Sequence, residues 1–350
     1  MDKRFQKAIQ ATQVLKKNPD ALPWKLDEPW AQRFYSWDAE EEAWEPAYNN
    51  TANDAHGNTS SDISALAVYS WNIDFMLPSA ESRMEAALTH LEKLLSQQSS
   101  PTTTAVVINL QECIPSDFVT ISRQQWVRDR FYITDLDTSC WASGAYGVTT
   151  LIDRRLDIVS CFRVHYSKTE QERDALFVDV AIPAAGSSAQ QRLRLGNSHL
   201  ESLALDPPLR PSQVQIMSTY MRADSVSSAI TTGDFNAIQP FDRSLHSDNG
   251  LKDAYLELGG REDDDEGYTW GQQALRDLRE RFGCSRMDKA YFCGRDLRPL
   301  SFERFGADVE VHEDKKRQRD QLLSLGFEKA WVTDHLGIKA VFSWKNSIRL

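Results

Sequence analysis

The chain has 350 residues, 41% of them hydrophobic, and a formal net charge of −11. This composition excludes a disordered protein, and no apolar run approaches the ~20 residues that a membrane helix requires. The acidic balance argues against a broad basic surface that coats nucleic acid, although it leaves room for a locally positive groove. Five scattered cysteines without a C-x-x-C pair indicate neither a disulfide framework nor a structural zinc site.

The chain divides into three parts by composition. Residues 1–48 hold four tryptophans close together, and such aromatic density rarely stays in solvent. We therefore expect an N-terminal extension docked on the main domain or, alternatively, a segment that binds a partner. Residues 49–64 are polar and predict a linker, whereas residues 65–350 alternate strand-like and helix-like patterns, as is typical of an α/β domain. The N-terminus has no apolar signal-peptide core, so we expect an intracellular location.

Polar side chains follow the strand-like runs of the main domain. In chain order they are Asn72 and Asp74 in "SWNID", Glu112 in "INLQE", His199 and Ser202 in "NSHLES", Asp234 and Asn236 in "TTGDFN", Asp288 in "SRMDK", and Asp334 and His335 in "VTDHL". A single Asp or Asn at a strand end is usually a turn former or a helix cap. Because active sites of sheet-based folds gather at strand ends, six such endings together predict one assembled site.

The residue types in this group suit phosphate chemistry. Alternate side chains of an extended chain share a face, so Asp234 and Asn236 would point together while Phe235 points into the core. Such a pair can hold an attacking water, and the carboxylate can take its proton. Carboxylate and amide oxygens elsewhere in the group are hard ligands suited to Mg²⁺, and two histidines can meet the negative charge of a phosphate.

The quoted segments, together with "CIP", "GYTWG" and "AYF", resemble in order and spacing the motifs of the endonuclease/exonuclease/phosphatase superfamily over residues 66–345. Within it, "WNID", "LQECIP", "HLES" and "YTW" are most similar to the tyrosyl-DNA phosphodiesterase 2 (TDP2) branch. The resemblance implies a four-layer α/β sandwich of two mixed β-sheets flanked by helices, with residues 65–350 as the catalytic domain.

The resemblance also implies a metal site. Carried over by motif, Glu112 is similar to the main Mg²⁺ ligand, with Asn72 and Asp74 beside it and Asp334 supporting the metal ligands. Mn²⁺ accepts the same oxygen ligands, so the choice between the two ions stays open.

The remaining motif positions imply catalytic roles. Asp234 resembles the group that orients and deprotonates the attacking water, and Asn236 the one that positions it. His335 resembles the histidine that stabilises charge on the phosphate, with Asp288 as its hydrogen-bonding partner, and His199 resembles a phosphate contact.

Substrate contacts follow from the same comparison of motifs. Ser202 resembles a phosphate contact, and Trp270 matches an aromatic position of the substrate groove, although a merely half-buried tryptophan fits the sequence equally well. Ile238 stands where relatives often carry a basic residue, which puts one DNA backbone contact in doubt.

Three other features have plainer interpretations. Arg210 and Gln213, at the start of a helix, read as structural residues. The acidic run 261–267 reads as a solvated loop more readily than as a metal site, and "KKRQR" at 315–319 reads as part of a charged helix more readily than as a nuclear address.

The function implied by the resemblance is Mg²⁺-dependent hydrolysis of the 5′-phosphotyrosyl bond between a DNA end and a trapped topoisomerase, in DNA repair. The alternatives are the same fold acting as an abasic-site endonuclease, an RNA 3′-end nuclease or a lipid or inositol phosphatase. A non-catalytic scaffold would require the loss of site residues, and all are present. We expect a monomer in the nucleus or cytoplasm.

Overall fold

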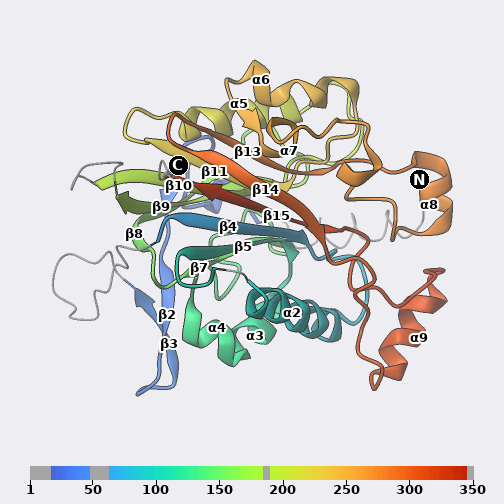
Figure 1. Ribbon diagram of the computed structural model, residues 1–350. Coiled ribbons are helices and arrows are strands. Elements are labelled where there is room, and N and C mark those ends of the chain that lie inside the picture. Colours follow the sequence, from blue (N-terminus) through green and yellow to red (C-terminus); the bar gives the residue numbers. More distant parts are fainter. Residues whose placement is uncertain (1–16, 48–62, 99, 184–189, 345–350) are drawn as a thin grey trace.

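The computed structural model describes residues 17–47, 63–98, 100–183 and 190–344 (Figure 1). Two mixed β-sheets pack face to face, and helices cover the outer face of each, which confirms the predicted four-layer α/β sandwich. None of the helices in the described ranges has the length and apolar character needed to span a bilayer.

One sheet has seven strands. Its order is β1 (Pro29–Ala31), β8 (Asp157–His165), β9 (Asp174–Pro183), β10 (Gln190–Ser198), β11 (Ser228–Asp234), β13 (Asp288–Gly294) and β12 (Lys252–Asp253). Only β10 and β11 pair in parallel among these strands, because α5 (Arg210–Met221) connects them across the outer face. The short helices α6 (Leu245–Asp248) and α7 (Ala254–Glu257) lie in the same outer layer (Figure 1).

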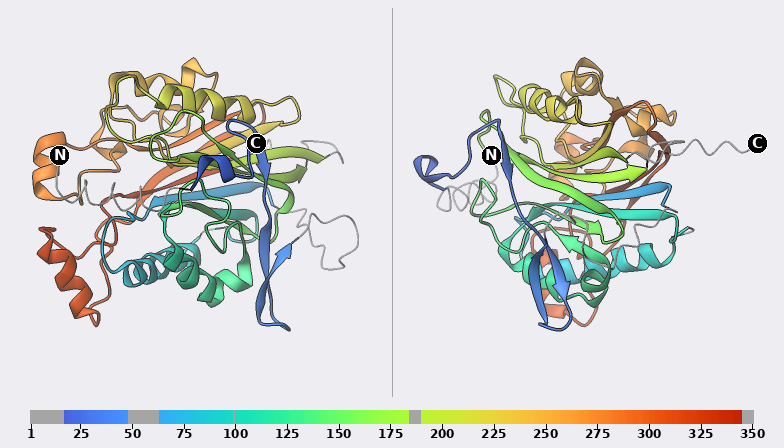
Figure 2. Two further views of the ribbon diagram at one scale, coloured as in Figure 1. Left: turned by 180° about the vertical axis from the view of Figure 1, so that it is seen from behind. Right: turned by 90° about the vertical axis from the view of Figure 1, so that its left-hand side faces the viewer.

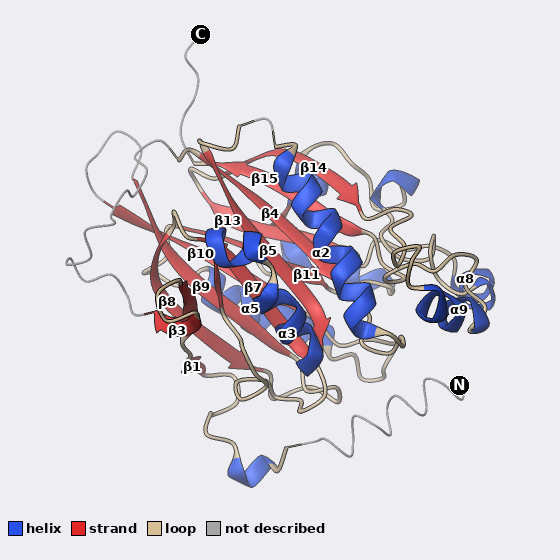
Figure 3. Ribbon diagram, turned by 90° about the horizontal axis from the view of Figure 1, so that it is seen from below, coloured by secondary structure: helices blue, strands red, loops and turns tan. Residues whose placement is uncertain are grey.

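The other sheet has eight strands. Its order is β14 (Arg298–Phe305), β15 (Gly337–Ser343), β4 (Ala65–Asn72), β5 (Thr104–Cys113), β7 (Gly147–Asp153), β6 (Phe131–Ile133), β2 (Phe34–Asp38) and β3 (Ala43–Ala47). The parallel pair here is β4 and β5, joined by α2 (Ala80–Ser96). Figure 3 shows α2 and α3 (Pro115–Arg123) crossing the outer face of this sheet, and α4 (Gln125–Arg130) follows α3.

Alternation along the central strands explains why both faces of each sheet are covered. On β4, Leu66 and Val68 pack in the core between the sheets, whereas Tyr69 and Trp71 pack against the helix layer. Because successive side chains of a strand point to opposite faces, a strand such as β4, which is apolar along most of its length, must be covered on both sides.

The described part of the Trp-rich N-terminal extension, residues 17–47, contributes strands to both sheets. After a 3₁₀ turn, η1 (Pro19–Ala21), β1 pairs with β8 at the edge of the seven-stranded sheet, and β2 pairs with β6 at the edge of the eight-stranded sheet. Figure 2 shows this blue segment crossing from one layer to the other. Trp24 is buried and stacks on His165 with ring centroids 3.9 Å apart. The predicted linker lies mostly outside the described residues, and the predicted domain boundaries stay a prediction.

The segments that connect the later strands contain four short elements. They are the 3₁₀ turns η2 (Pro240–Arg243) and η3 (Asp265–Gly267) and the helices α8 (Arg276–Phe282) and α9 (Lys316–Ser324). In Figure 1, α8 and α9 lie at the right, at the end of the sheets where β4 and β5 finish. The connections at this end carry the polar side chains that the sequence singles out.

Buried polar side chains join the two sheets close to this end. The Asn109 amide donates to the Thr232 hydroxyl at 2.8 Å, and the Gln111 amide donates to the Asn197 Oδ1 at 2.8 Å. All four residues are at most 1% exposed. Hydrogen bonds between buried polar groups are directional, so this layer fixes how the two sheets are placed against each other beneath the site.

Candidate active site

The first group of site residues comes from the eight-stranded sheet. Asn72 ends β4, Glu112 lies near the end of β5, and Asp334 precedes β15. The Asn72 amide donates to Glu112 Oε1 at 3.3 Å, and the other Glu112 oxygen accepts from the Phe75 main chain at 2.9 Å. We call Asn72, Asp74, Glu112 and Asp334 the acidic group.

Two members of the acidic group have strained main chains. Asp74 and Glu112 have φ values of 57° and 59°, in the left-handed region that residues with a Cβ rarely adopt. Glu112 lies at a register irregularity between Leu110 and Cys113 in the pairing of β5 with β7. Such strain persists only where the surrounding structure enforces it, and it is concentrated at functional sites.

The acidic group concentrates negative charge. Burial, together with the nearby carboxylates of Asp334 and Glu112, raises the pKa of Asp74 to about 8. Burial also raises the pKa of Asp334, against the opposing effect of His335. Because Asp334 and Glu112 raise the pKa of Asp74, these carboxylates repel one another, and a positive charge among them would be stabilised. Oxygen donors of this kind fit a divalent cation such as Mg²⁺.

The second group centres on Asp234, the last residue of β11. Its Oδ2 accepts from the Asn72 amide at 3.0 Å and lies 3.3 Å from His199 Nε2 and 3.7 Å from His335 Nε2. Burial raises the pKa of Asp234, but His335 and His199 outweigh this and hold it below its usual value. Asp234 is therefore ionised at neutral pH.

The predicted extended alternation stops at Asp234, because β11 ends there and Asn236 has a φ of 47°, in the left-handed region. The main-chain N–H of Asn236 donates to Asp234 Oδ1 at 2.8 Å, and the Asn236 amide donates to the Leu200 carbonyl at 3.1 Å. Phe235 is 2% exposed and packs edge-on against Tyr291, with ring centroids 4.8 Å apart. The aromatic residue thus anchors the strand end in the core, while Asn236 contacts Asp234 through its main chain.

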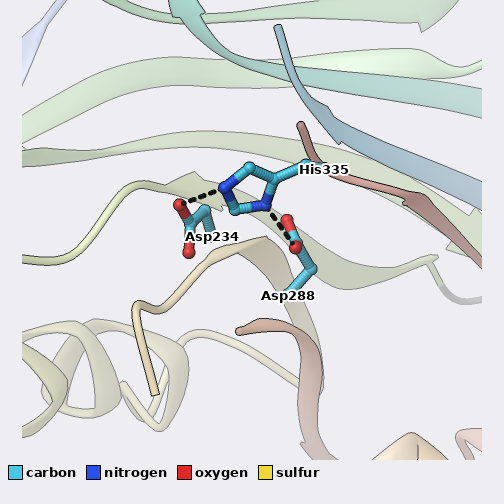
Figure 4. A group of neighbouring side chains, drawn as sticks. All are labelled: Asp234, Asp288 and His335. Carbon is cyan, nitrogen blue, oxygen red and sulfur yellow. Dashed lines mark hydrogen bonds and ion pairs between the residues drawn. The ribbon is translucent and has the colours of Figure 1, made fainter. Parts of the chain in front are cut away.

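His335 lies between two carboxylates (Figure 4). Its Nδ1 is 2.9 Å from Asp288 Oδ2, and its Nε2 faces Asp234. Burial lowers the pKa of His335, but Asp288 and Asp234 raise it well above its ordinary value, so the ring is charged at neutral pH. We call Asp234, Asp288, His335 and His199 the histidine group.

The ligand atoms of Asp234, Asp288 and His335 lie within 4.8 Å of one another, a spacing that could also hold a metal ion. Both nitrogens of His335 already face carboxylates, however, and a metal bound at one of them would replace that contact. Among the described residues the spacing of ligand atoms marks this cluster, whereas the acidic group is a candidate metal position through its oxygen donors and the mutual repulsion of its carboxylates.

Arg173 is a site residue that the sequence analysis missed. Its Nη1 lies 2.5 Å from His199 Nδ1, and its Nη2 donates to Gln171 Oε1 at 2.9 Å. A guanidinium only donates, so His199 Nδ1 must be the acceptor and the ring proton must be on Nε2, which faces Asp234. A lone arginine in the polar loop "QERD" looks solvent-exposed in the sequence, yet this one is 5% exposed.

The two predicted substrate contacts have different surroundings. The Trp270 indole N–H donates to Asp334 Oδ2 at 2.7 Å, which places this ring beside the acidic group. The Ser202 hydroxyl instead donates to Gln171 Oε1 at 2.9 Å. A phosphate contact by Ser202 stays a prediction, and in this structure the serine supports Gln171, which in turn accepts from Arg173.

Other predicted residues hold the loops around the site. Arg210 donates through two nitrogens to Asp242, each at 2.8 Å, and also to the carbonyls of Glu201 and Leu203. Gln213 accepts from the Glu201 main chain at 2.8 Å, so both residues have the structural role expected of them.

The acidic run 261–267 also has a structural role. Glu262 pairs with Arg286 and Lys289, two buried cations on either side of Asp288, and Asp263 pairs with Arg243. The solvated-loop interpretation was therefore incomplete, because Glu262 neutralises cations that support the strand carrying Asp288.

Comparisons with known proteins identify the family of the chain. The model of the Endonuclease/Exonuclease/phosphatase family matches residues 69–335. The chain belongs to this family. The match spans the strand ends from β4 to His335, and the family fold supports a hydrolase acting on a phosphodiester or phosphate. No curated protein matches the chain significantly by sequence.

Solved structures of the family share the fold. Truncated TDP2 from Caenorhabditis elegans aligns with a TM-score of 0.58 at 20% identity over 80% of this chain and 97% of that chain. TDP2 from D. rerio, complexed with a single-strand DNA product, gives 0.58 at 18% identity over 80% and 99%. The human Nocturnin catalytic domain with a bound sulfate anion gives 0.52 at 16% identity over 80% and 94%. At these identities the likeness establishes the fold alone.

Proposed function

We propose that the chain is a Mg²⁺-dependent phosphodiesterase that hydrolyses 5′-phosphotyrosyl bonds at DNA ends, as left by a trapped topoisomerase. The observation that carries the proposal is the meeting of the acidic and histidine groups, where the Asn72 amide donates to both Glu112 and Asp234. One amide thus links a cluster of hard oxygen donors to a candidate general base.

The acidic group would hold the ion. Glu112, Asp74 and Asp334 offer carboxylate oxygens and Asn72 an amide oxygen, a donor set that fits Mg²⁺ and also Mn²⁺. The mutual repulsion that raises the pKa of Asp74 supports this assignment, because a cation relieves it. When bound, Mg²⁺ supplies positive charge that stabilises the phosphate oxygens of the substrate.

Asp234 would activate the nucleophile. An ionised carboxylate with Asn236 beside it can orient a water molecule opposite the leaving tyrosine oxygen. As the water oxygen bonds to phosphorus, its proton passes to Asp234, the bond from phosphorus to the tyrosine oxygen breaks, and the phenolate takes a proton from solvent. The products are a 5′-phosphate end and tyrosine. His199 and His335 lie close to the same Asp234 oxygen, so they can contact the phosphate that the water attacks.

The two histidines would stabilise the phosphate. His335 is charged, and its Nε2 points toward the reaction centre because Asp288 binds Nδ1. His199 presents an Nε2 proton because Arg173 occupies Nδ1. Donors fixed in advance are worth more than mobile ones, since they cost no reorganisation during the reaction.

The choice of a phosphotyrosyl DNA substrate rests on the motif resemblance and on the TDP2 structures with similar folds. Trp270 lies next to Asp334, where its ring can stack on a base or on the tyrosine. Ile238 is 41% exposed, so the contact that a basic residue would make there is missing. We infer from this that binding relies more on stacking and less on phosphate pairing.

The test is cleavage of an oligonucleotide that carries a 5′-phosphotyrosine, in Mg²⁺ and in EDTA. An abasic duplex and an oligoadenylate serve as comparison substrates, and Asp234→Asn serves as the inactive control. We expect a 5′-phosphate product from the first substrate alone, and only with Mg²⁺ and Asp234 present. Cleavage of another substrate in its place would contradict the substrate, and failure on all three would contradict the activity.

A further inference from the structure

A buried arginine behind the acidic group uses every one of its side-chain donors on the main chain. Arg83 lies in the first turn of α2 and is 1% exposed. Its Nη1 donates to the carbonyls of Ile73 and Val332 at 2.5 and 2.7 Å. Its Nη2 donates to the main-chain carbonyls of Asp74 and Leu77 at 2.8 and 3.1 Å, and its Nε donates to the Pro78 carbonyl at 3.0 Å. A guanidinium has five N–H groups, and these contacts account for all five.

The five carbonyls belong to two chain segments that are far apart in the sequence. Four lie in the loop after β4, which carries Asp74, and the fifth, that of Val332, lies two residues before Asp334. A smaller link joins the same segments, because the Thr333 hydroxyl donates to the Asn72 carbonyl at 2.8 Å. Arg83 therefore makes the larger share of the hydrogen bonds between these two segments, and it donates to neither the Asp74 nor the Asp334 carboxylate.

The positive charge of Arg83 also favours the acidic group. All its hydrogen bonds go to neutral carbonyls. Burial lowers the pKa of Arg83, and the nearby carboxylates of Asp74, Asp117, Glu112 and Asp334 oppose that effect. A buried cation costs free energy unless negative charge is near, so the guanidinium and the acidic group stabilise each other. This cation lies behind the acidic group, where it keeps the main chain fixed and leaves the carboxylate oxygens free.

We propose that Arg83 is a positioning residue that fixes the separation of Asp74 and Asp334 and thereby sets the affinity of the acidic group for a divalent cation. The inference rests on the proposed function for the assignment of the ion to this group. Lysine keeps the charge but has a single nitrogen with three N–H groups, so it cannot donate to all five carbonyls of the two segments.

The experiment measures binding of Mn²⁺ alone, by electron paramagnetic resonance without substrate, to the wild type and to Arg83→Lys. The matched control is Arg194→Lys. Arg194 lies on β10, five residues before His199 in the sequence, and is 5% exposed. It donates to the Asp179 carboxylate and to the Tyr220 carbonyl. We expect Arg83→Lys to weaken Mn²⁺ binding ~10–100-fold, as is usual for residues that orient metal ligands, and Arg194→Lys to leave it unchanged. Both variants should unfold at a lower temperature.

A second variant covers the case in which Arg83→Lys does not fold. Thr333→Ala removes the smaller link between the same two segments, and we expect a weaker but measurable loss of Mn²⁺ affinity. Wild-type affinity in Arg83→Lys, or in Thr333→Ala if the first variant is unfolded, would overturn the inference, as would an equal loss in Arg194→Lys. A wild-type protein that does not bind Mn²⁺ would instead contradict the proposed function.

Discussion

The histidine group and the acidic group are the two halves of the site, and their buried charges are arranged in opposite ways. In the histidine group each carboxylate faces a ring nitrogen, with Asp288 2.9 Å and Asp234 3.7 Å from His335. In the acidic group, Asp74, Glu112 and Asp334 oppose one another, and the pKa of Asp74 rises to about 8. Opposite charges at close range stabilise both ionised forms, whereas like charges destabilise them.

The difference indicates a division of work. The histidine group is partly balanced internally, because the charged His335 ring lies between its two carboxylates, so it can accept a proton and donate hydrogen bonds without an added ion. The acidic group has a surplus of negative charge, and a divalent cation would complete it. The Asn72 amide, which donates to Glu112 and to Asp234, joins the halves and gives each a fixed distance from the other.

The largest effect should come from removing the base in the histidine group. Asp234→Asn keeps the shape of the side chain but loses its charge, and general-base help is typically worth ~10²–10⁴-fold. We expect a fall of that size in kcat on the phosphotyrosyl oligonucleotide, with Mg²⁺ binding retained. A variant that also lost the metal would show that the two halves are not separable.

A change in the acidic group should fail in a different way. Glu112→Gln removes one charged oxygen ligand, and we expect at least a ~100-fold loss of activity at 1 mM Mg²⁺, because even residues behind metal ligands are worth ~10–100-fold. Part of this loss should be recovered at higher Mg²⁺. If added Mg²⁺ restores Asp234→Asn and not Glu112→Gln, the assignment of the two halves is reversed.

The contact between Arg173 and His199 sharpens the account of the histidine group. Arg173→Gln should lower kcat/KM about 10–100-fold, since His199 loses the donor that keeps its proton on Nε2. Arg173→Lys retains a charged donor and should recover part of the activity. Full activity in Arg173→Gln would show that the tautomer of His199 is unimportant.

Trp270 lies at the boundary of the acidic group and the substrate. Trp270→Phe keeps an aromatic face but loses the hydrogen bond to Asp334, whereas Trp270→Ala loses both. Base stacking is worth ~1–3 kcal/mol, so Trp270→Ala should raise KM about 5–100-fold and Trp270→Phe much less. Equal effects of the two substitutions would mean that only the hydrogen bond to Asp334 matters.

The smallest expected effect is on stability, and it has a defined sign. The folded-state pKa of Asp74, about 8, exceeds its ordinary value of 3.8, so folding is favoured by its proton. Without metal, stability is greatest below pH 3.8 with respect to this group and is lost as the pH rises toward 8. We expect Asp74→Asn to raise the Tm measured in EDTA at pH 9 and to raise it much less at pH 5, where only a small part of the stability has been lost. A Tm lowered equally at both pH values would contradict the charge repulsion.

Much of the fold and of the grouping of the site residues could be predicted from the sequence. The largely apolar run of β4 and the burial of Phe235 beside Asp234 follow from local patterns. The left-handed main chain of Asn236, which ends the extended alternation, does not. The buried arginines could not be predicted in this way. Arg83 lies on the apolar stripe of α2, yet the carbonyls that make its burial tolerable come partly from Val332, far along the chain.

The N-terminal strands were missed for a related reason. Residues 29–31 and 34–47 form short edge strands, and their partners on β8 and β6 lie about a hundred residues away or more. Short strands have weak patterns of their own, and their pairing is decided by the sheet edges that the rest of the chain leaves open. The tryptophans indicated that the extension packs on the main domain, but they did not indicate which sheet edges it joins.

The central claim is that the acidic group, and not the histidine group, holds the divalent cation. A crystal of the protein soaked in Mn²⁺ and measured near the manganese absorption edge would locate the ion by its anomalous scattering. We predict a peak among Glu112, Asp74, Asn72 and Asp334, with His335 still bound to Asp288. A single peak among Asp234, Asp288 and His335, with the acidic group empty, would contradict the account.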